Sequence, residues 1–156
     1  MIMRIDSGKI PFGRYVQEFC KNKYPGYEKG CPNYNSKVGC PPCELINEIL
    51  DLDKDLFLVY TEFEIGKFAE RMKKAHPGWT EKQCFNSRLW QTRARKEHRL
   101  EVERFKKEYN MEVISQPERK GVDINLLFSR IGIKLEWPPR KLARVVSLAG
   151  WKIQKV

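Results

Sequence analysis

The sequence lacks the features that would assign it at once to a class of protein. No stretch approaches the ~20 consecutive apolar residues that a membrane-spanning helix needs, and the N-terminus has no apolar segment typical of a secretory signal peptide. We therefore expect a cytoplasmic protein without a membrane partner. The chain also lacks a Gly-rich phosphate loop and the HExxH, GxSxG and CxxxCxxC motifs. No catalytic residue is predicted, and the sequence leaves open whether the protein is an enzyme.

The chain is long enough and apolar enough to fold around one core. Of its 156 residues 41% are hydrophobic and 12% aromatic, and a chain of this length buries roughly two-thirds of its unfolded surface on folding. We expect a single small domain over residues 1–156. Histidine is scarce: His76 precedes a Pro-Gly turn, and His98 lies on an apolar stripe. Because neither has an obvious Ser or Cys partner in the sequence, we expect both to have structural roles.

Positive charge is concentrated in the second half of the chain. Lys and Arg number 30 against 20 Asp and Glu, which gives a net charge of +10. Counted along the sequence, residues 1–65 carry −2, residues 66–109 carry +7 and residues 110–156 carry +5. Such a balance attracts polyanions, of which RNA is the obvious candidate. The alternative is a soluble surface rich in Lys and Arg, as in many heat-adapted proteins.

Hydrophobic periodicity predicts a short sheet with packed helices after residue 43. Apolar side chains at helical spacing predict helices over residues 44–51, 66–75, 80–110, 122–131 and 140–149. Aromatic and β-branched runs predict strands over residues 56–65, 111–115, 133–137 and 151–153. This alternation favours an α/β or α+β fold, with residues 44–156 as the body. Residues 1–43 show no periodicity and are predicted to be irregular.

Cysteine is concentrated in the irregular segment. Four of the five cysteines fall within residues 20–43: Cys20, Cys31, Cys40 and Cys43. Gly precedes and Pro follows both Cys31 and Cys40, a context of tight turns. We predict that these four thiolates form a metal-binding loop. Cys84 is expected to lie in the core, with a fifth, reactive thiol as the alternative.

The spacing of the four cysteines leaves the metal open. Irregular spacing with Pro after Cys is typical of iron–sulfur ligands and favours a 4Fe-4S cluster. Zinc is the alternative, since Cys40 and Cys43 have the spacing of one zinc knuckle. Four buried thiols without a metal are the remaining interpretation.

Two stretches carry a resemblance to a known family. Residues 31–42 read Cys-Pro-Asn-Tyr-Asn-Ser-Lys-Val-Gly-Cys-Pro-Pro, and residues 116–124 read Gln-Pro-Glu-Arg-Lys-Gly-Val-Asp-Ile. This pattern resembles the predicted metal-binding family known as domain of unknown function 2284, and the similarity spans most of residues 20–138. Cys20 matches the family's upstream cysteine.

The resemblance implies one metal centre. The family usually carries a second cysteine group after its long helix, but residues 111–116 contain no Cys. It thus implies a single centre held by Cys20, Cys31, Cys40 and Cys43, and it favours iron–sulfur over zinc. It supplies no activity, because the family itself is uncharacterised.

The predicted helix over residues 80–110 carries a group of cations that we call the basic cluster: Arg88, Arg93, Arg95, Lys96 and Arg99. Forked arginine donors suit phosphates, so the basic cluster is the predicted nucleic-acid-binding surface. A second basic group, residues 140–144, could extend it. The alternative is a solvated face on which these cations pair with Glu97, Glu101 and Glu103. Trp90 begins the apolar stripe of this helix and is expected in the core.

These patterns predict a metal-binding protein with one iron–sulfur cluster that acts in RNA- or sulfur-related chemistry. The alternative is a non-catalytic zinc-binding module that binds nucleic acid or a protein partner.

Overall fold

An antiparallel sheet of four strands forms the centre of the protein. The structure is a computed structural model that describes residues 1–23 and 27–154. The strands are β1 (Ile2–Ile5), β2 (Leu56–Phe63), β3 (Glu112–Ser115) and β4 (Ala143–Gly150). They lie in the order β1-β2-β4-β3, and every neighbouring pair is antiparallel. The prediction of a single small domain with a short sheet and packed helices is confirmed, and its class is α+β.

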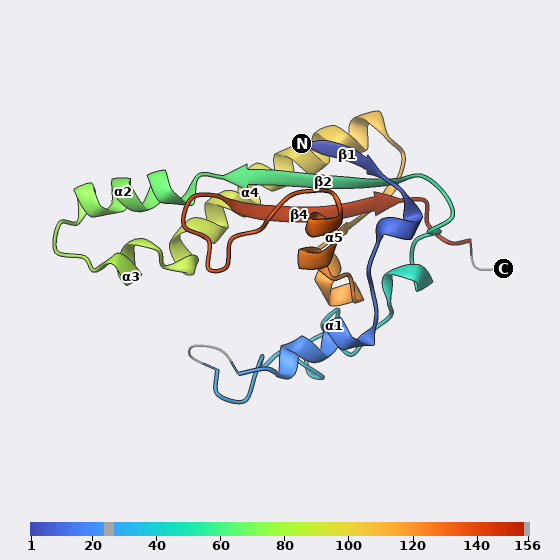
Figure 1. The fold of residues 1–156 in the computed structure, drawn as a ribbon, viewed down its shortest axis with the longest axis horizontal. Coiled ribbons are helices and arrows are strands. Elements are labelled where there is room, and N and C mark those ends of the chain that lie inside the picture. Colours follow the sequence, from blue (N-terminus) through green and yellow to red (C-terminus); the bar gives the residue numbers. More distant parts are fainter. Residues whose placement is uncertain (24–26, 155–156) are drawn as a thin grey trace.

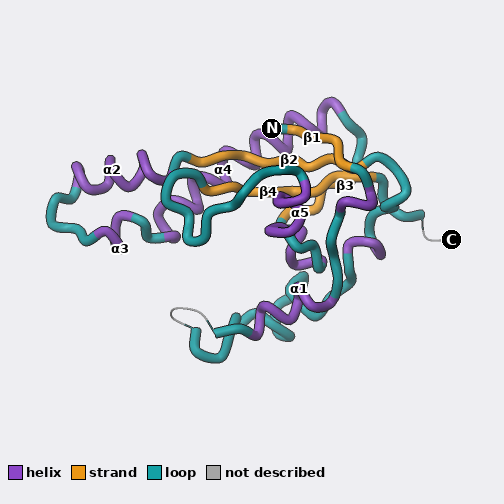
Figure 2. The backbone as a smooth tube through the Cα atoms, in the orientation of Figure 1, coloured by secondary structure: helices purple, strands orange, loops and turns teal. Residues whose placement is uncertain are grey.

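Helices cover both faces of this sheet (Figures 1 and 2). The α-helices are α1 (Arg14–Glu18), α2 (Ile65–Ala75), α3 (Glu81–Cys84), α4 (Ser87–Glu108) and α5 (Ile124–Arg130). Short 3-10 turns are η1 (Ser7–Lys9), η2 (Phe19–Lys21), η3 (Ile46–Glu48) and η4 (Pro117–Lys120). Among the described residues, no helix is both long and apolar enough to cross a membrane.

Alternate side chains of β2 divide between two cores, as the period of two in a strand requires. On one face, Leu58 and Tyr60 pack with α5, and the rings of Tyr60 and Phe128 meet edge to face at 5.5 Å. On the other face, Val59 packs against Phe105 of α4. The long helix and the short helix α5 therefore lie on opposite sides of the sheet.

Helices α2 and α3 and the first turns of α4 form an arm beyond one end of the sheet (Figure 1). A separate small core holds this arm together, in which Phe63 from the end of β2 packs with Phe68 of α2 and Ala94 of α4. Residues 65–99 run through this arm and back along α4 to His98 on the sheet, and they carry ten Lys and Arg against three Glu. The fold thus places part of this basic stretch beyond the end of the central sheet.

Several predicted elements occur where the periodicity placed them: β2, α2, β3 and α5. Asp123 caps α5, because its side chain accepts a hydrogen bond from the Leu126 N–H at 3.0 Å.

The predicted helix over residues 80–110 is interrupted at residues 85–86. The side chain of Asn86 accepts from the Arg88 N–H and starts α4 as a second, separate helix.

Other predictions were wrong because long-range pairing outweighed the local pattern. Residues 143–150 form β4, not a helix, since they pair with β2 on one side and β3 on the other. The predicted strand over residues 133–137 is irregular. The predicted helix over residues 44–51 is reduced to η3, and only an isolated bridge at Lys152 replaces the last predicted strand.

The N-terminal segment is not wholly irregular. Residues 2–5 form β1, which is too short to give a periodic signal and is held by its pairing with β2. Residues 11–13 are then tied to the start of α5: Gly13 N–H donates to the Gly121 carbonyl, and Asp123 N–H donates to the Pro11 carbonyl, both at 2.9 Å. These bonds hold α1 and the cysteine-rich segment against the body.

Candidate metal centre and basic surface

Turns in the N-terminal segment bring three of the four predicted metal ligands together. The Cys31 N–H donates to the Cys20 carbonyl at 2.7 Å, which closes η2 against the turn that follows. The Asn35 N–H donates to the Pro41 carbonyl at 2.7 Å and joins that turn to the Cys40 segment. The Cys20 thiol therefore lies within electrostatic range of the Cys31 and Cys40 thiols.

The surroundings of the Cys20 thiol disfavour its charged form. Burial raises the pKa of the Cys20 thiol, and the neighbouring sulfurs of Cys31 and Cys40 raise it further. The Arg119 guanidinium acts in the opposite direction, whereas the Glu118 carboxylate raises the pKa as well. Metal ligands must be thiolates, so a bound cation would supply the positive charge that this group of sulfurs lacks.

Gly30 makes the close approach of the Cys20 and Cys31 backbones possible. Its φ is +82°, and a Cβ built on it would lie 2.7 Å from the Cys20 carbonyl oxygen and 2.6 Å from that of Lys21. Any other residue would have to push these carbonyls away. Gly39, before Cys40, has a similar φ of +81° but open space around its missing Cβ.

The fourth predicted ligand, Cys43, faces a different neighbour. Its thiol donates to the Arg119 carbonyl at 3.2 Å, and the Lys120 ammonium lies 3.7 Å from its sulfur. The Gln17 side chain, only 2% exposed, donates to the carbonyls of both Cys43 and Arg119. Gln17 thus joins the cysteine segment to η4, and the Cys43 sulfur is held on that side.

Across the described part of the chain, no three His, Cys, Asp or Glu side chains stand close enough to enclose a single metal ion. The structure therefore brings Cys20, Cys31 and Cys40 into one neighbourhood without closing a site for one ion. Cys84 is 3% exposed and lies in α3, away from the N-terminal segment that holds the others.

All members of the basic cluster are exposed on α4. At about 100° per residue, Arg88, Arg95 and Arg99 fall within about 40° of one another on the helix surface. Arg93 packs its guanidinium 5.4 Å from the centre of the Phe68 ring, and Arg95 contacts Gln91 at 3.4 Å. The helix therefore presents three arginines on one side, as its periodicity predicted.

The expected pairing of these cations with glutamates does not occur. No carboxylate oxygen of the described residues lies within 4.0 Å of any cation in the basic cluster. Glu101 instead pairs with the Met1 ammonium and Arg104, each at 3.4 Å. Arg140 and Arg144 pair with Glu81 and Glu62, so these two arginines of the second basic group do not extend the unpaired surface.

The aromatic and imidazole rings of this region belong to the interior. Trp90 is half-buried and stacks on Phe63 with ring centres 6.1 Å apart. His98 is 5% exposed and bonds Thr61 and Ser147 of the sheet. The expected structural role of His98 thus has a direct geometric basis.

A scan against protein-family models, a search of curated proteins and a search of solved structures each found no match to this chain. The resemblance to the predicted metal-binding family therefore rests on the residues quoted for it above.

Sequence patterns missed the part of the body that faces the thiols. Gln17 and the η4 residues Glu118, Arg119 and Lys120 surround the cysteines, but only η4 lay within a stretch that carried the family resemblance. Gln17 gave no signal, because a single amide in an irregular segment becomes informative only when its burial is known.

Proposed function

We propose that this protein is a cytoplasmic metal-binding protein that holds one 4Fe-4S cluster in its N-terminal cysteine segment. The observation that carries the proposal is the proximity of Cys20 to Cys31 and Cys40, which are separated in sequence; Cys40 is buried, and Cys20 and Cys31 are half-buried. Soft thiolates in this number are the donor set of iron–sulfur clusters. The irregular spacing of these cysteines favours a cluster over a two-knuckle zinc site.

The four ligands are not equivalent in this proposal. Cys20, Cys31 and Cys40 are the ligands that the backbone turns prepare. Cys43 is the fourth, and it has to release the Arg119 carbonyl before its sulfur can bind. A cluster held by all four thiolates would supply electron transfer, whereas a cluster held by Cys20, Cys31 and Cys40 alone would leave one iron open to a sulfur-containing or RNA substrate.

Metal analysis of matched cysteine variants tests this ligand set. Protein purified without oxygen is assayed for iron, labile sulfide and zinc on the same sample, together with its visible spectrum. Cys40→Ala is expected to lose the cluster and disorder residues 27–43, because metal binding and local folding are coupled. Cys43→Ala is expected to retain most of the iron, and Cys84→Ala, the control, all of it.

Each outcome bears on the proposal. Equal iron and sulfide in Cys40→Ala and the unchanged protein would refute the ligand set. A colourless protein with one zinc would replace it with the alternative, a non-catalytic zinc module that binds nucleic acid or a protein partner. A protein that holds neither metal would refute metal binding altogether.

We further propose that the basic cluster binds a polyanion, most plausibly RNA. The specific support is that no carboxylate oxygen of the described chain lies within 4.0 Å of its five exposed cations, although glutamates stand at helical spacing on the same helix. Arginines without an ion pair keep their donors free for phosphate oxygens. The first turns of α4, which carry Arg88 and Arg93, belong to the arm beyond the end of the sheet, where an extended polymer can reach them (Figure 1).

The salt dependence of binding tests this second proposal. A labelled single-stranded RNA is titrated at several salt concentrations against the protein and against a triple variant with Arg88, Arg95 and Arg99 changed to Ala. Each lost phosphate contact reduces the slope of log K against log salt by about 0.7, so we expect a reduction of roughly 2.

A matched triple variant removes the same charge from the other end of α4: Arg104, Lys106 and Lys107 changed to Ala. It is expected to keep the slope of the unchanged protein. Equal losses in both triple variants would show that net charge alone drives the binding and would refute the basic cluster as the site.

A further inference from the structure

The outer edge of β1 has free backbone groups. Met1 and Tyr60 exchange backbone hydrogen bonds of 2.7 and 2.9 Å, which makes them a hydrogen-bonded pair of the antiparallel ladder. Alternation along β1 then directs the N–H and C=O groups of Ile2 and Arg4 away from β2. Within the described chain β1 pairs with β2 alone, and these outward groups have no backbone partner. The edge is therefore open to another strand.

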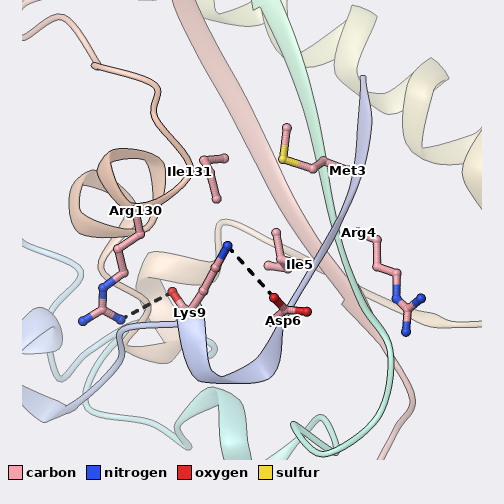
Figure 3. A pocket seen from close by; sticks show the side chains of 7 residues that line it. All are labelled: Met3, Arg4, Ile5, Asp6, Lys9, Arg130 and Ile131. Atoms are coloured by element: carbon pink, nitrogen blue, oxygen red, sulfur yellow. Dashed lines mark hydrogen bonds and ion pairs between the residues drawn. The ribbon is translucent and has the colours of Figure 1, made fainter.

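A pocket of about 280 Å³ lies alongside this edge, between β1, η1 and the end of α5 (Figure 3). Met3 and Ile5 extend from β1 toward Ile131 and make its floor apolar. One water occupies roughly 30 Å³ in the liquid, so the pocket has room for a side chain. An open strand edge beside a side-chain pocket is the arrangement that binds extended peptides.

Two cations give this pocket a preference for negative charge. The Lys9 ammonium lies 4.0 Å from the Asp6 carboxylate, at the outer limit of an ion pair, and the Asp6 side chain is 85% exposed. Arg130 donates to the Lys9 carbonyl at 3.4 Å and has no carboxylate of the described chain within 4.0 Å. With Asp6 as the one carboxylate that lines the pocket, Lys9 and Arg130 leave it with an excess of positive charge.

Arg4 does not close the edge, although a charged side chain on an edge strand usually discourages pairing. Its guanidinium pairs at 2.5 Å with Asp55, which immediately precedes the inner neighbour β2. Figure 3 shows the Arg4 side chain on the opposite side of β1 from Met3 and Ile5, although Arg4 is among the residues that line the pocket. The position that an added strand would occupy is left clear.

We propose that an extended acidic segment of a partner protein docks on β1 as a fifth strand of the sheet. Its main chain bonds the outward groups of Ile2 and Arg4, and one of its carboxylates enters the pocket between Lys9 and Arg130. Main-chain bonding supplies affinity, and the pocket supplies selectivity for acidic side chains. This surface is separate from the cysteine segment and from the basic cluster.

Fluorescence anisotropy with defined peptides tests the proposal on the full chain. The probe is a labelled peptide of about ten residues that alternates valine and glutamate, so that one face of the strand is acidic. Its controls are the valine–lysine peptide and the acidic peptide with alternate backbone nitrogens methylated. The valine–glutamate peptide is expected to bind at least tenfold more tightly than either.

Two kinds of variant separate the pocket from the edge. Lys9→Glu combined with Arg130→Glu reverses the pocket's charge, and Arg4→Pro removes an outward N–H at a position where an edge strand tolerates proline. Each is expected to weaken binding at least tenfold, with circular dichroism checking the fold. The Arg88, Arg95 and Arg99 triple alanine variant is expected to bind the peptide normally.

Two results would overturn the proposal: binding that survives the pocket and edge variants, or binding that the triple alanine variant abolishes. In either case the peptide would bind another basic surface. Sedimentation is run in parallel. A dimer that Arg4→Pro dissolves would also overturn it, since the edge would then be covered by a second copy of this chain.

Discussion

Acidification is predicted to destabilise the fold through His98. Its imidazole lies between α4 and the sheet, with Nδ1 3.0 Å from Thr61 Oγ1 and Nε2 2.7 Å from Ser147 Oγ. Burial, together with a smaller effect of the Met1 ammonium, lowers the pKa of His98 from 6.5 to about 4, and Glu101 opposes the shift. The folded protein therefore keeps His98 neutral at pH values where the unfolded chain protonates it.

The sign and size of the effect follow from these two pKa values. Above about pH 6.5 the imidazole is neutral in both states and its contribution to stability is fully present. As pH falls from about 6.5 to about 4, the unfolded chain binds a proton that the folded protein refuses. A gap of about 2.5 units at about 1.4 kcal/mol each amounts to about 3.5 kcal/mol, of which about 3 kcal/mol is lost by pH 4, a large part of an ordinary domain's 5–15 kcal/mol.

Urea unfolding, followed by circular dichroism from pH 7 to pH 4, measures this loss. The comparison is His98→Gln, whose side-chain amide can still form hydrogen bonds but cannot take up the proton. Carboxylate titration and any loss of metal act on both proteins, so they cancel in the difference between the two pH profiles. The unchanged protein is expected to lose about 3 kcal/mol more than the variant over this range.

His76→Gln removes the exposed histidine and is expected to follow the unchanged protein. Parallel profiles for the unchanged protein and His98→Gln would refute the reasoning.

Three further substitutions have expected outcomes. Gly30→Ala should lower metal content and disturb the cysteine turns, whereas Gly39→Ala, with the same backbone strain but open space, should retain the metal; equal metal content would contradict the steric argument. Phe105→Ala should reduce the free energy of unfolding by about 3–5 kcal/mol and Leu100→Ala, half-exposed on the same helix, by no more than about 0.5 kcal/mol, as measured by urea unfolding. Asp123→Ala should cost about 1 kcal/mol through loss of the α5 cap, and Asp123→Asn should restore most of it, since an amide oxygen can also cap. If Asp123→Asn lost as much free energy of unfolding as Asp123→Ala, the effect would come from the carboxylate charge and not from the cap.

Local patterns were sufficient where an element satisfies its own requirements. The apolar stripe of α4 predicted which face meets the sheet, because a helix bonds its backbone within itself. The cap of α5 is equally local, because Asp123 stands directly before the helix and its side chain accepts from the Leu126 N–H. β4 was mistaken for a helix because a strand is completed by its neighbours, and its partners come from residues 56–63 and 112–115.

The amino-acid sequence by itself determined which chemistry the protein can offer: four N-terminal thiols with turn-forming Gly and Pro around them, and a helix rich in arginine. The tertiary structure decided how these groups meet. It placed Cys43 against Arg119, 76 residues along the chain, and Cys20 near Cys31 and Cys40. Within the described residues it also left the basic cluster without a carboxylate oxygen inside 4.0 Å and the outer edge of β1 without a partner strand. Side-chain contacts at this range depend on how layers pack, and packing is a property of the whole chain that no local spacing contains.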